Sequence, residues 1–299
     1  MIHGIINVYK EKGFTSHDVV AKLRGIVGQK KIGHTGTLDP DATGVLPVCL
    51  GKATKLCDLL TDKNKTYEAV LLLGKTTDTQ DITGEVLEEK STEALTEEKV
   101  REAIEGFIGD YEQIPPMYSA LKVNGKKLYE LAREGKVIER KARPVKILDI
   151  QILEIDLPKV RMEVSCSKGT YIRTLCHDIG EKLGCGGCME SLIRTRVSTF
   201  RIEDAKMLDE IETLKQEGKL AELLVPIDAM FPSYPKITVK DDWKAFAKNG
   251  NPLDLKMLKE ACGQDEETQV RLYDESGKFI AIYQWKEKNY HIVKMFFNE

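Results

Sequence analysis

The sequence has no long apolar run, no disulfide pattern and no excess of basic charge. A bilayer span needs about 20 apolar residues, and no stretch approaches that length. The first apolar stretch, at 5–8, is too short for a signal-peptide core and is soon followed by charged residues. The seven cysteines are an odd number scattered along 299 residues, unlike a disulfide framework. We therefore expect a cytoplasmic protein with no membrane segment.

Motifs for metals and nucleotide cofactors are also missing. Cys185 and Cys188 form the only close cysteine pair, and no second pair or His-x-x-x-His sequence accompanies them. The glycine-rich loop at 33–44 does not lead into a P-loop, because Ala53 stands where that motif requires Ser or Thr. No G-x-G-x-x-G sequence follows a strand. We expect chemistry without a metal, nucleotide or redox cofactor, and a glycine-rich turn around the two cysteines.

The net charge of −3 does not indicate nucleic-acid binding, but the charge is unevenly distributed. Residues 119–146 include nine Lys or Arg and three Glu, whereas residues 203–228 include eight acidic and three basic residues. A charge run is more often a solvated surface than a binding site. An RNA-binding protein nevertheless needs a basic face rather than a basic total, so 119–146 is a candidate RNA surface.

Apolar periodicity and turn residues predict a mixture of helices and strands, typical of an α+β fold. The predicted helices lie at 15–27, 52–60, from 96 onward and at 171–183, and the predicted strands at 67–73, 145–155, 160–166 and 196–202. Residues 113–143 have weak periodicity and predict a long insertion with one short helix near 128–133. Three prolines between 226 and 235 indicate a boundary, after which a hairpin and a further strand predict a small β-rich tail.

The loop at 33–44 is suited to presenting a carboxylate. Pro40 keeps the backbone of Asp39 away from helical angles. Three glycines in the loop permit backbone angles that other residues avoid. On these grounds alone the plainer interpretation, in which Asp39 simply begins an Asp-Pro turn, is the more frequent one.

Five segments, in order along the chain, match motifs of one enzyme family. They are Gly-His-Thr-Gly-Thr-Leu-Asp-Pro at 33–40 with Ala-Thr-Gly-Val-Leu-Pro at 42–47, Lys-Thr-Tyr-Glu at 65–68 with Gly-Lys-Thr-Thr-Asp-Thr at 74–79, the stretch 113–129, Cys-Ser-Lys-Gly-Thr-Tyr-Ile-Arg-Thr at 166–174, and Leu192 with Arg194. Together they resemble the bacterial tRNA pseudouridine-55 synthases, the TruB family.

This resemblance implies a fold and a domain division. The expected pseudouridine synthase fold is α+β, with a mixed, mainly antiparallel sheet flanked by helices. Residues 1–230 would form the catalytic domain, with an RNA-gripping insertion at about 119–146. Residues 231–299 would form a small β-barrel-like, PUA-type RNA-binding domain.

The resemblance also implies three catalytic residues: Asp39, Tyr67 and Arg173. Pseudouridine formation breaks the N1–C1′ bond of uridine and joins C5 to C1′ without redox change or energy input, which fits the missing cofactor motifs. A carboxylate is able to act as a nucleophile in such a reaction, and the resemblance assigns this role to Asp39. Arg173 would keep that carboxylate ionised, and Tyr67 would stack on the target base and take part in proton transfer.

Further positions are implied to bind substrate. Tyr171 and Leu192 would line the pocket, and His34 would fill the space left by an extruded nucleotide. Lys10 matches a basic position in the family's first strand. The lysines of the insertion that would hold RNA phosphates are Lys122, Lys126 and Lys127. Each of these residues also has a plainer interpretation as a core, loop or surface side chain.

The expected function is therefore isomerisation of the T-loop uridine, position 55 of tRNA, by an aspartate nucleophile and base flipping. The expected partner is tRNA, contacted through its T arm, and we expect a monomer without an obligate protein partner. A tRNA-folding chaperone that binds without chemistry is one alternative. A guide-RNA-dependent relative of the same superfamily is another. Attack at C1′, attack at C6 and proton abstraction at C2′ all remain open.

Overall fold

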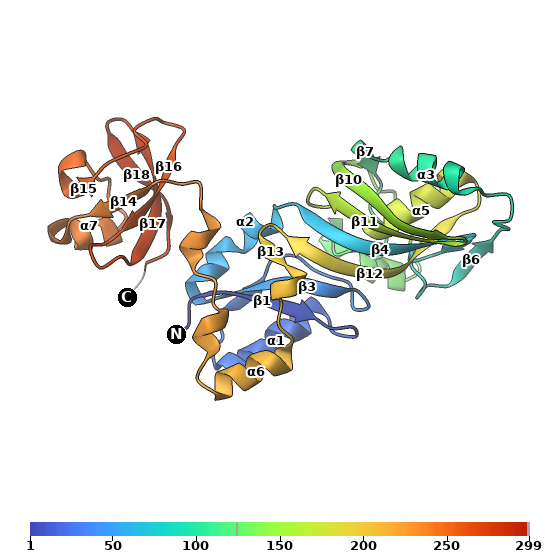
Figure 1. Cartoon of the computed structure of the whole chain (residues 1–299), viewed down its shortest axis with the longest axis horizontal. Coiled ribbons are helices and arrows are strands. Elements are labelled where there is room, and N and C mark those ends of the chain that lie inside the picture. The colour runs from blue at the N-terminus through green and yellow to red at the C-terminus, as the bar shows by residue number, and fades with distance from the viewer. Residues whose placement is uncertain (124, 298–299) are drawn as a thin grey trace.

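The computed structural model describes residues 1–123 and 125–297. A large β-sheet with helices extends through most of the chain, and a smaller sheet forms a unit at the C-terminal end (Figure 1). Within the described ranges, no helix is both long and apolar enough to cross a membrane.

The large sheet is mixed and mainly antiparallel, as expected. Its strands in spatial order are β1 (Gly4–Lys10), β3 (Thr43–Leu50), β12 (Gly187–Val197), β4 (Lys65–Leu73), β11 (Lys159–Cys166), β10 (Arg143–Asp156) and β7 (Gly109–Gln113), with β2 (Ile32–His34) beside β3 and β13 (Phe200–Arg201) beside β12. The pairing of β12 with β3 is parallel. This contact joins the two halves of the sheet and brings the start of β3 beside the middle of β12.

Helices cover the sheet at two places. Near β1 and β3, α1 (Ser16–Val27) and α6 (Leu208–Gln216) share an apolar core with these strands. Further along, α3 (Glu97–Glu105) and α5 (Ile172–Leu183) pack with β4, β10 and β11 (Figure 1). The predicted helix at 15–27 is confirmed: Thr15 and Asp18 form a reciprocal capping box, and Gly28 ends the helix at φ 69°.

Shorter elements connect these parts. They are η1 (Gly51–Leu56), α2 (Cys57–Thr61), β5 (Lys75–Thr77), β6 (Val86–Glu89), β8 (Lys122–Val123), β9 (Lys126–Lys127), α4 (Leu128–Arg133), η2 (Ile202–Asp204), η3 (Leu220–Leu223) and η4 (Ile227–Met230). Residues 114–142, between β7 and β10, form the insertion, and 143–146, which the expected insertion included, belong to β10. The short helix expected near 128–133 is present as α4.

Two sequence-based assignments are wrong. The predicted strand at 196–202 is interrupted, because the chain turns at Ser198, with φ 54°, and Phe200 pairs back onto Val197. The predicted helix at 52–60 is the 3-10 helix η1 followed by the five-residue α2. Around the cysteine pair, Cys185 lies in the turn after α5 and Cys188 lies in β12, both with buried thiols.

The C-terminal unit has its own sheet and core. Its strands in spatial order are β15 (Leu258–Glu260), β14 (Lys236–Val239), β16 (Gln269–Tyr273), β17 (Phe279–Lys286) and β18 (Asn289–Met295), accompanied by η5 (Asp241–Trp243), α7 (Lys244–Lys248) and η6 (Leu255–Met257). An apolar cluster continues into the preceding part of the chain, where Phe231 and Phe296 belong to the same cluster as Ile5 and Val45. The division at 230/231, still a prediction, thus falls within packed apolar side chains.

Candidate functional site

Asp39 lies in the loop between β2 and β3. Buried neighbours of Asp39 and a hydrogen bond to α1 hold this loop in place. Leu38 and Ala42 are buried on either side of it, while 43% of the Asp39 side chain is exposed. The Leu38 N–H donates to Ser16 Oγ over 2.9 Å, which ties the loop to the start of α1. Just beyond the loop, a Cβ on Gly44 would clash with the backbone of Arg194, so the close approach of β3 to β12 requires glycine there.

Arg173 projects from the first turn of α5 towards this carboxylate. Its side chain is only 6% exposed, and its Nε lies 3.0 Å from Asp39 Oδ2. Burial raises the pKa of Asp39, and the guanidinium of Arg173 opposes this rise by favouring the charged carboxylate. The structure therefore brings together the two residues that the sequence placed 134 positions apart.

A second carboxylate, Asp81, also contacts Arg173 and was not predicted. Its Oδ2 lies 3.5 Å from Arg173 Nη1, and its side chain is 15% exposed. The backbone N–H of Thr83 and the hydroxyl of Thr79 both donate to Asp81 Oδ1. The negative charge of Asp81 contributes to the raised pKa of Asp39. The sequence signal was its place two residues after the 74–79 motif, but no periodicity connects it to Arg173.

Apolar and aromatic side chains surround the carboxylate. Tyr67 on β4 is buried in the same cluster as Leu38 and Leu192, and it lies opposite Arg194 in the register of β4 with β12. Burial raises the pKa of Tyr67 to about 12, so the phenol is neutral at pH 7. Tyr171, the residue before α5, is half-buried, and burial raises its pKa as well. The charge of Asp39 makes a smaller contribution to the raised pKa of both tyrosines.

Two fully buried cations support the Asp39 loop from beneath. Arg194 donates through Nε to the Val45 carbonyl over 2.8 Å and through Nη2 to the Gly36 carbonyl over 3.2 Å. Lys10 donates through Nζ to the Pro40 carbonyl over 3.0 Å. The sequence identified Arg194 as part of a motif but assigned it no task. For Lys10, the structure shows a contact with the loop backbone rather than an exposed ammonium.

His34 on β2 lies before the Asp39 loop. Its ring meets the edge of His17 at a centroid distance of 5.5 Å, and burial lowers its pKa, so the imidazole is neutral at pH 7. Among the described residues, its Nδ1 has no hydrogen-bond partner. This leaves a buried polar atom beside the loop.

The insertion lysines stand on the β8–β9 hairpin, and they do not share one face. Lys122 pairs with Lys127, so their side chains project from the same face, while Lys126 pairs with Val123 and projects from the other. Lys126 Nζ lies 3.4 Å from Glu134 Oε1. Lys127 Nζ contacts the hydroxyl of Tyr129 at 3.2 Å. The structure therefore groups Lys122 with Lys127 and separates Lys126 from them.

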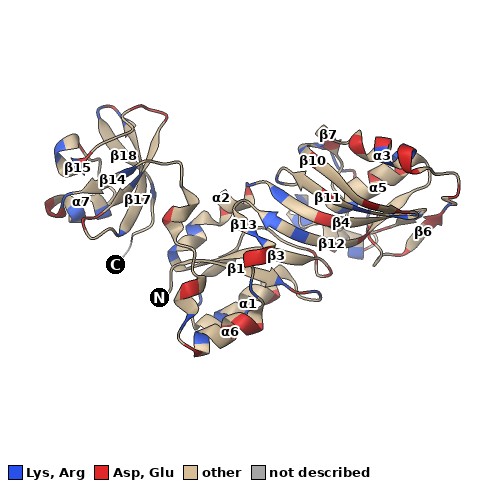
Figure 2. Cartoon of the chain, in the orientation of Figure 1, with Lys and Arg blue, Asp and Glu red and all other residues tan. Residues whose placement is uncertain are grey.

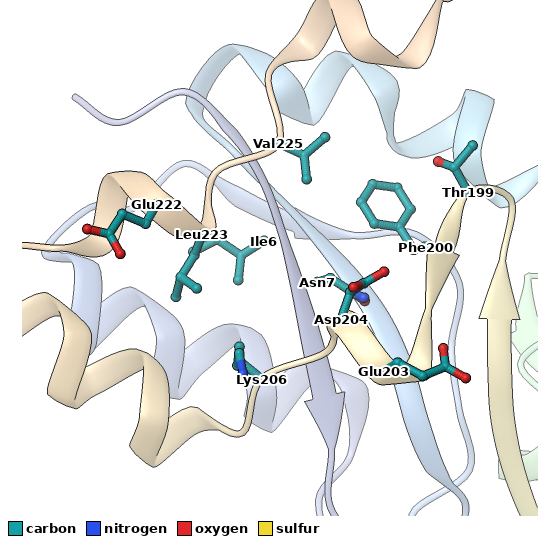
Figure 3. Close-up of a pocket in the computed structure, with 10 residues that line it drawn as sticks. All are labelled: Ile6, Asn7, Thr199, Phe200, Glu203, Asp204, Lys206, Glu222, Leu223 and Val225. Atoms are coloured by element: carbon teal, nitrogen blue, oxygen red, sulfur yellow. The ribbon is translucent and has the colours of Figure 1, made fainter.

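A cavity of about 460 Å³ lies elsewhere, between β1, the η2 region and η3 (Figure 3). Glu203, Asp204 and Glu222 line it, with Lys206 as a basic neighbour (Figure 3). This acidic lining repels RNA phosphates, and none of the predicted site residues lines the cavity. The Asp39 side chain lies outside this cavity and is 43% exposed.

Comparison with known proteins places the chain. The TruB family pseudouridylate synthase N-terminal domain matches residues 24–172, and the tRNA pseudouridylate synthase B C-terminal domain matches residues 173–232. A relative from Lachnoclostridium phytofermentans, named tRNA pseudouridine synthase B, is 58% identical over 99% of this chain and 100% of its own length. The chain belongs to the TruB family. A further TruB relative with the same name, from Alkaliphilus oremlandii, is 47% identical over 96% of this chain and 91% of its own.

Solved structures agree with TruB membership and confirm the expected pseudouridine synthase fold. An H/ACA ribonucleoprotein bound to a substrate RNA containing 2′-deoxyuridine includes a chain with a TM-score of 0.73 and 26% identity. That match covers 99% of this chain and 86% of the other. A chain in a Cbf5–Nop10–Gar1 complex matches with a TM-score of 0.72 and 28% identity, over 99% of this chain and 85% of the other.

Proposed function

We propose that this TruB-family protein converts the uridine at position 55, in the T-loop of tRNA, to pseudouridine, with Asp39 as the nucleophile. The observation that carries the proposal is the Asp39–Arg173 pair. A partly exposed carboxylate lies 3.0 Å from a buried guanidinium, and the neutral phenol of Tyr67 is buried in the same apolar cluster as Leu38, the residue before Asp39. This combination supplies a charged nucleophile next to an apolar surface suited to a base.

The chemistry balances within the uridine itself. The N1–C1′ bond breaks, the C5–C1′ bond forms, and the proton on C5 is lost as N1 gains one. Attack at C1′, attack at C6 and proton abstraction at C2′ each begin from the ionised Asp39, which Arg173 favours. Tyr67 is protonated at neutral pH and is buried in one apolar cluster with Leu38 and Leu192; its ring would stack on the target base, and its hydroxyl would take part in proton transfer.

Base flipping fits the surroundings of Asp39. A base inside a folded RNA loop is out of reach of a loop carboxylate, so the nucleotide has to be extruded. Tyr67 and Leu192 offer an aromatic and an aliphatic wall, and Tyr171 lies at the start of α5. The neutral imidazole of His34 occupies the space that the extruded base leaves. Lys122 and Lys127 bind RNA phosphates next to the T-loop.

The relatives support this substrate over the alternatives. The curated relatives that match nearly the whole chain at 58% and 47% identity are named as tRNA enzymes. The ribonucleoprotein relative is 26% identical, which favours a stand-alone enzyme over a guide-RNA-dependent one. We therefore propose that the protein acts on the T arm of tRNA as a cytoplasmic monomer, with the C-terminal unit as a PUA-type RNA-binding domain. A chaperone needs no Asp39–Arg173 pair, so that pair favours chemistry over binding alone.

The direct test is pseudouridine mapping on an unmodified tRNA transcript incubated with the purified protein alone. We expect conversion at position 55, and its persistence after EDTA treatment of the folded transcript. A transcript with cytidine at that position is the matched control and should gain no pseudouridine. Conversion only at another uridine contradicts the assigned position, and no conversion contradicts the proposed activity.

A further inference from the structure

Gln113, the last residue of β7, ties the root of the insertion to the start of α5. Its side chain is 1% exposed. The Tyr171 N–H donates to Gln113 Oε1 over 2.8 Å, and Gln113 Nε2 donates to the Tyr171 carbonyl over 3.0 Å. The amide thus satisfies both polar groups of one backbone residue, as a neighbouring strand would. That residue stands two positions before Arg173, so Gln113 fixes the backbone from which Arg173 projects.

The insertion also reaches the other end of Arg173. Arg173 Nη2 donates to the carbonyl of Tyr118 over 2.8 Å, and Tyr118 lies five positions after Gln113. The hydroxyl of Tyr118 in turn donates to Asp78 Oδ2 over 3.1 Å, in the loop that leads to Asp81. Gln113 at the root of the insertion therefore holds the backbone next to Arg173, and Tyr118 within the insertion holds its guanidinium.

The remaining donors of Arg173 leave little freedom. Nε faces Asp39, while Nη1 donates to the Thr79 carbonyl and faces Asp81. A guanidinium is a rigid planar fork, so a shift of its backbone alters several of these contacts together. We propose that Gln113 is a positioning residue for the isomerisation, which sets Arg173 against Asp39 and makes that pair depend on the placement of the insertion. The inference rests on the proposed function, because it assumes that the pair does chemistry.

The first test is Gln113→Met, which keeps a similar shape and removes both hydrogen bonds. We expect kcat on tRNA to fall by roughly ten- to a hundredfold, as small misplacements near a reacting group do. KM should change little, because the RNA-facing lysines remain in place. Circular dichroism shows whether the variant is folded under the assay conditions.

The second test is Gln113→Glu, whose effect on kcat should depend on pH. A protonated carboxyl group accepts from the Tyr171 N–H and donates to the Tyr171 carbonyl, as the amide does. An ionised one is unable to donate and places negative charge against that carbonyl. Burial raises the pKa of a carboxyl group, so the ratio of variant to unaltered kcat should rise as the pH falls towards about 5.

Asp178→Ala is the matched control. Asp178 lies further along α5 and accepts a hydrogen bond from the hydroxyl of Tyr111, also on β7. Its loss removes a second tie between the same strand and helix, and it should lower the melting temperature while kcat stays near the unaltered value. The inference is overturned if Gln113→Met behaves like this control, or if the Gln113→Glu ratio is flat with pH. Failure of the unaltered protein to convert uridine instead contradicts the proposed function, and the inference falls with it.

Discussion

Asp39 and Lys122 are both proposed to meet the RNA, yet they stand on different kinds of support. Beneath the Asp39 loop lie two fully buried cations, Arg194 and Lys10, which donate to backbone carbonyls in and beside the loop. The insertion that carries Lys122 has a small core of three buried side chains and a hairpin of two residue pairs. Its lysines are exposed, apart from the half-buried Lys127, and Lys126 and Lys136 both contact Glu134. Along the whole ribbon, basic and acidic residues are interspersed (Figure 2).

The difference corresponds to the two tasks. A reacting carboxylate has to be held to a fraction of an ångström, and buried hydrogen bonds provide that precision. A phosphate contact tolerates small shifts, because a lysine is a flexible point charge. Segments with few buried apolar contacts also open at a lower free-energy cost, so we expect the insertion to adjust to RNA more readily than the Asp39 loop.

The largest expected effect separates chemistry from binding. Asp39→Asn keeps the shape of the side chain and removes its charge, so pseudouridine formation should fall by several orders of magnitude. Affinity for tRNA should change little, because many contacts across the RNA contribute to it. Single-turnover kinetics and a binding titration measure the two quantities.

Asp41→Asn is the control for that substitution, because Asp41 lies in the same loop and is exposed. Its rate of pseudouridine formation and its affinity for tRNA should be close to those of the unaltered protein. Comparable rates for Asp39→Asn and the unaltered protein would remove Asp39 as the nucleophile and, with it, the contrast between the two regions.

The support beneath the loop provides the next test. Arg194→Met leaves the carbonyls of Gly36 and Val45 without their buried donor, which should cost about 3 kcal/mol of unfolding free energy. In protein that remains folded, kcat should fall by roughly tenfold or more as the loop loses its fixed position. Arg196→Met, at an exposed position on the same strand, should change neither quantity appreciably. Unaltered kcat in folded Arg194→Met would show that the loop holds its shape without this clamp.

Local sequence patterns were sufficient for parts of the fold. The α1 capping box and the terminal Gly28 are local signals, and helix and strand periodicity located α5 and β4. Strand β12 was not predicted over its full length, because a bulge between Met189 and Ser191 breaks its alternation. The turn at Ser198 was not predicted either, since Ser-Thr is a weaker turn signal than Gly or Pro.

For the site, sequence resemblance supplied the residue types and the structure supplied their partners. The motif around Asp39 and the motif around Arg173 were both visible, but their contact depends on the packing of α5 beside the loop. Asp81 contacts Arg173, and Gln113 contacts the Tyr171 backbone. No local sequence pattern encodes either contact. The burial of Lys10 was likewise hidden, because a lysine is usually exposed.

Substitutions of lysines in the insertion should have a smaller effect, which falls on tRNA affinity. Lys122→Ala combined with Lys127→Ala removes two ammonium groups from one face of the hairpin. Affinity for tRNA should fall by roughly tenfold, and the slope of log K against log salt should become shallower by about 0.7–0.9 per lost phosphate contact. Lys126→Ala with Lys136→Ala is the matched pair, because both of these lysines contact Glu134. Equal losses in the two double variants would show that the face of the hairpin does not matter.

The smallest expected effect is on the pH dependence of the unfolding free energy, and it concerns Lys10, the buried lysine beneath the Asp39 loop. Burial lowers the pKa of Lys10 from 10.5 to about 8, so between these values the unfolded chain binds more protons than the folded one. The free energy of unfolding therefore rises with pH through this window, since the folded state no longer bears the cost of a buried charge. Below the window both states are charged, and above it neither is.

Lys10→Met should remove this contribution. Urea denaturation at about pH 7.5 and about pH 9.5 should show the unaltered protein gaining on the order of 1 kcal/mol relative to the variant. The raised pKa of Tyr67 is common to both proteins and cancels in the difference. Lys122→Met, at an exposed position of the insertion, is the control. The difference in unfolding free energy between the unaltered protein and Lys122→Met should stay the same at both pH values. A difference between the unaltered protein and Lys10→Met that stays constant with pH would mean that Lys10 reaches solvent, so the loop would rest on Arg194 alone.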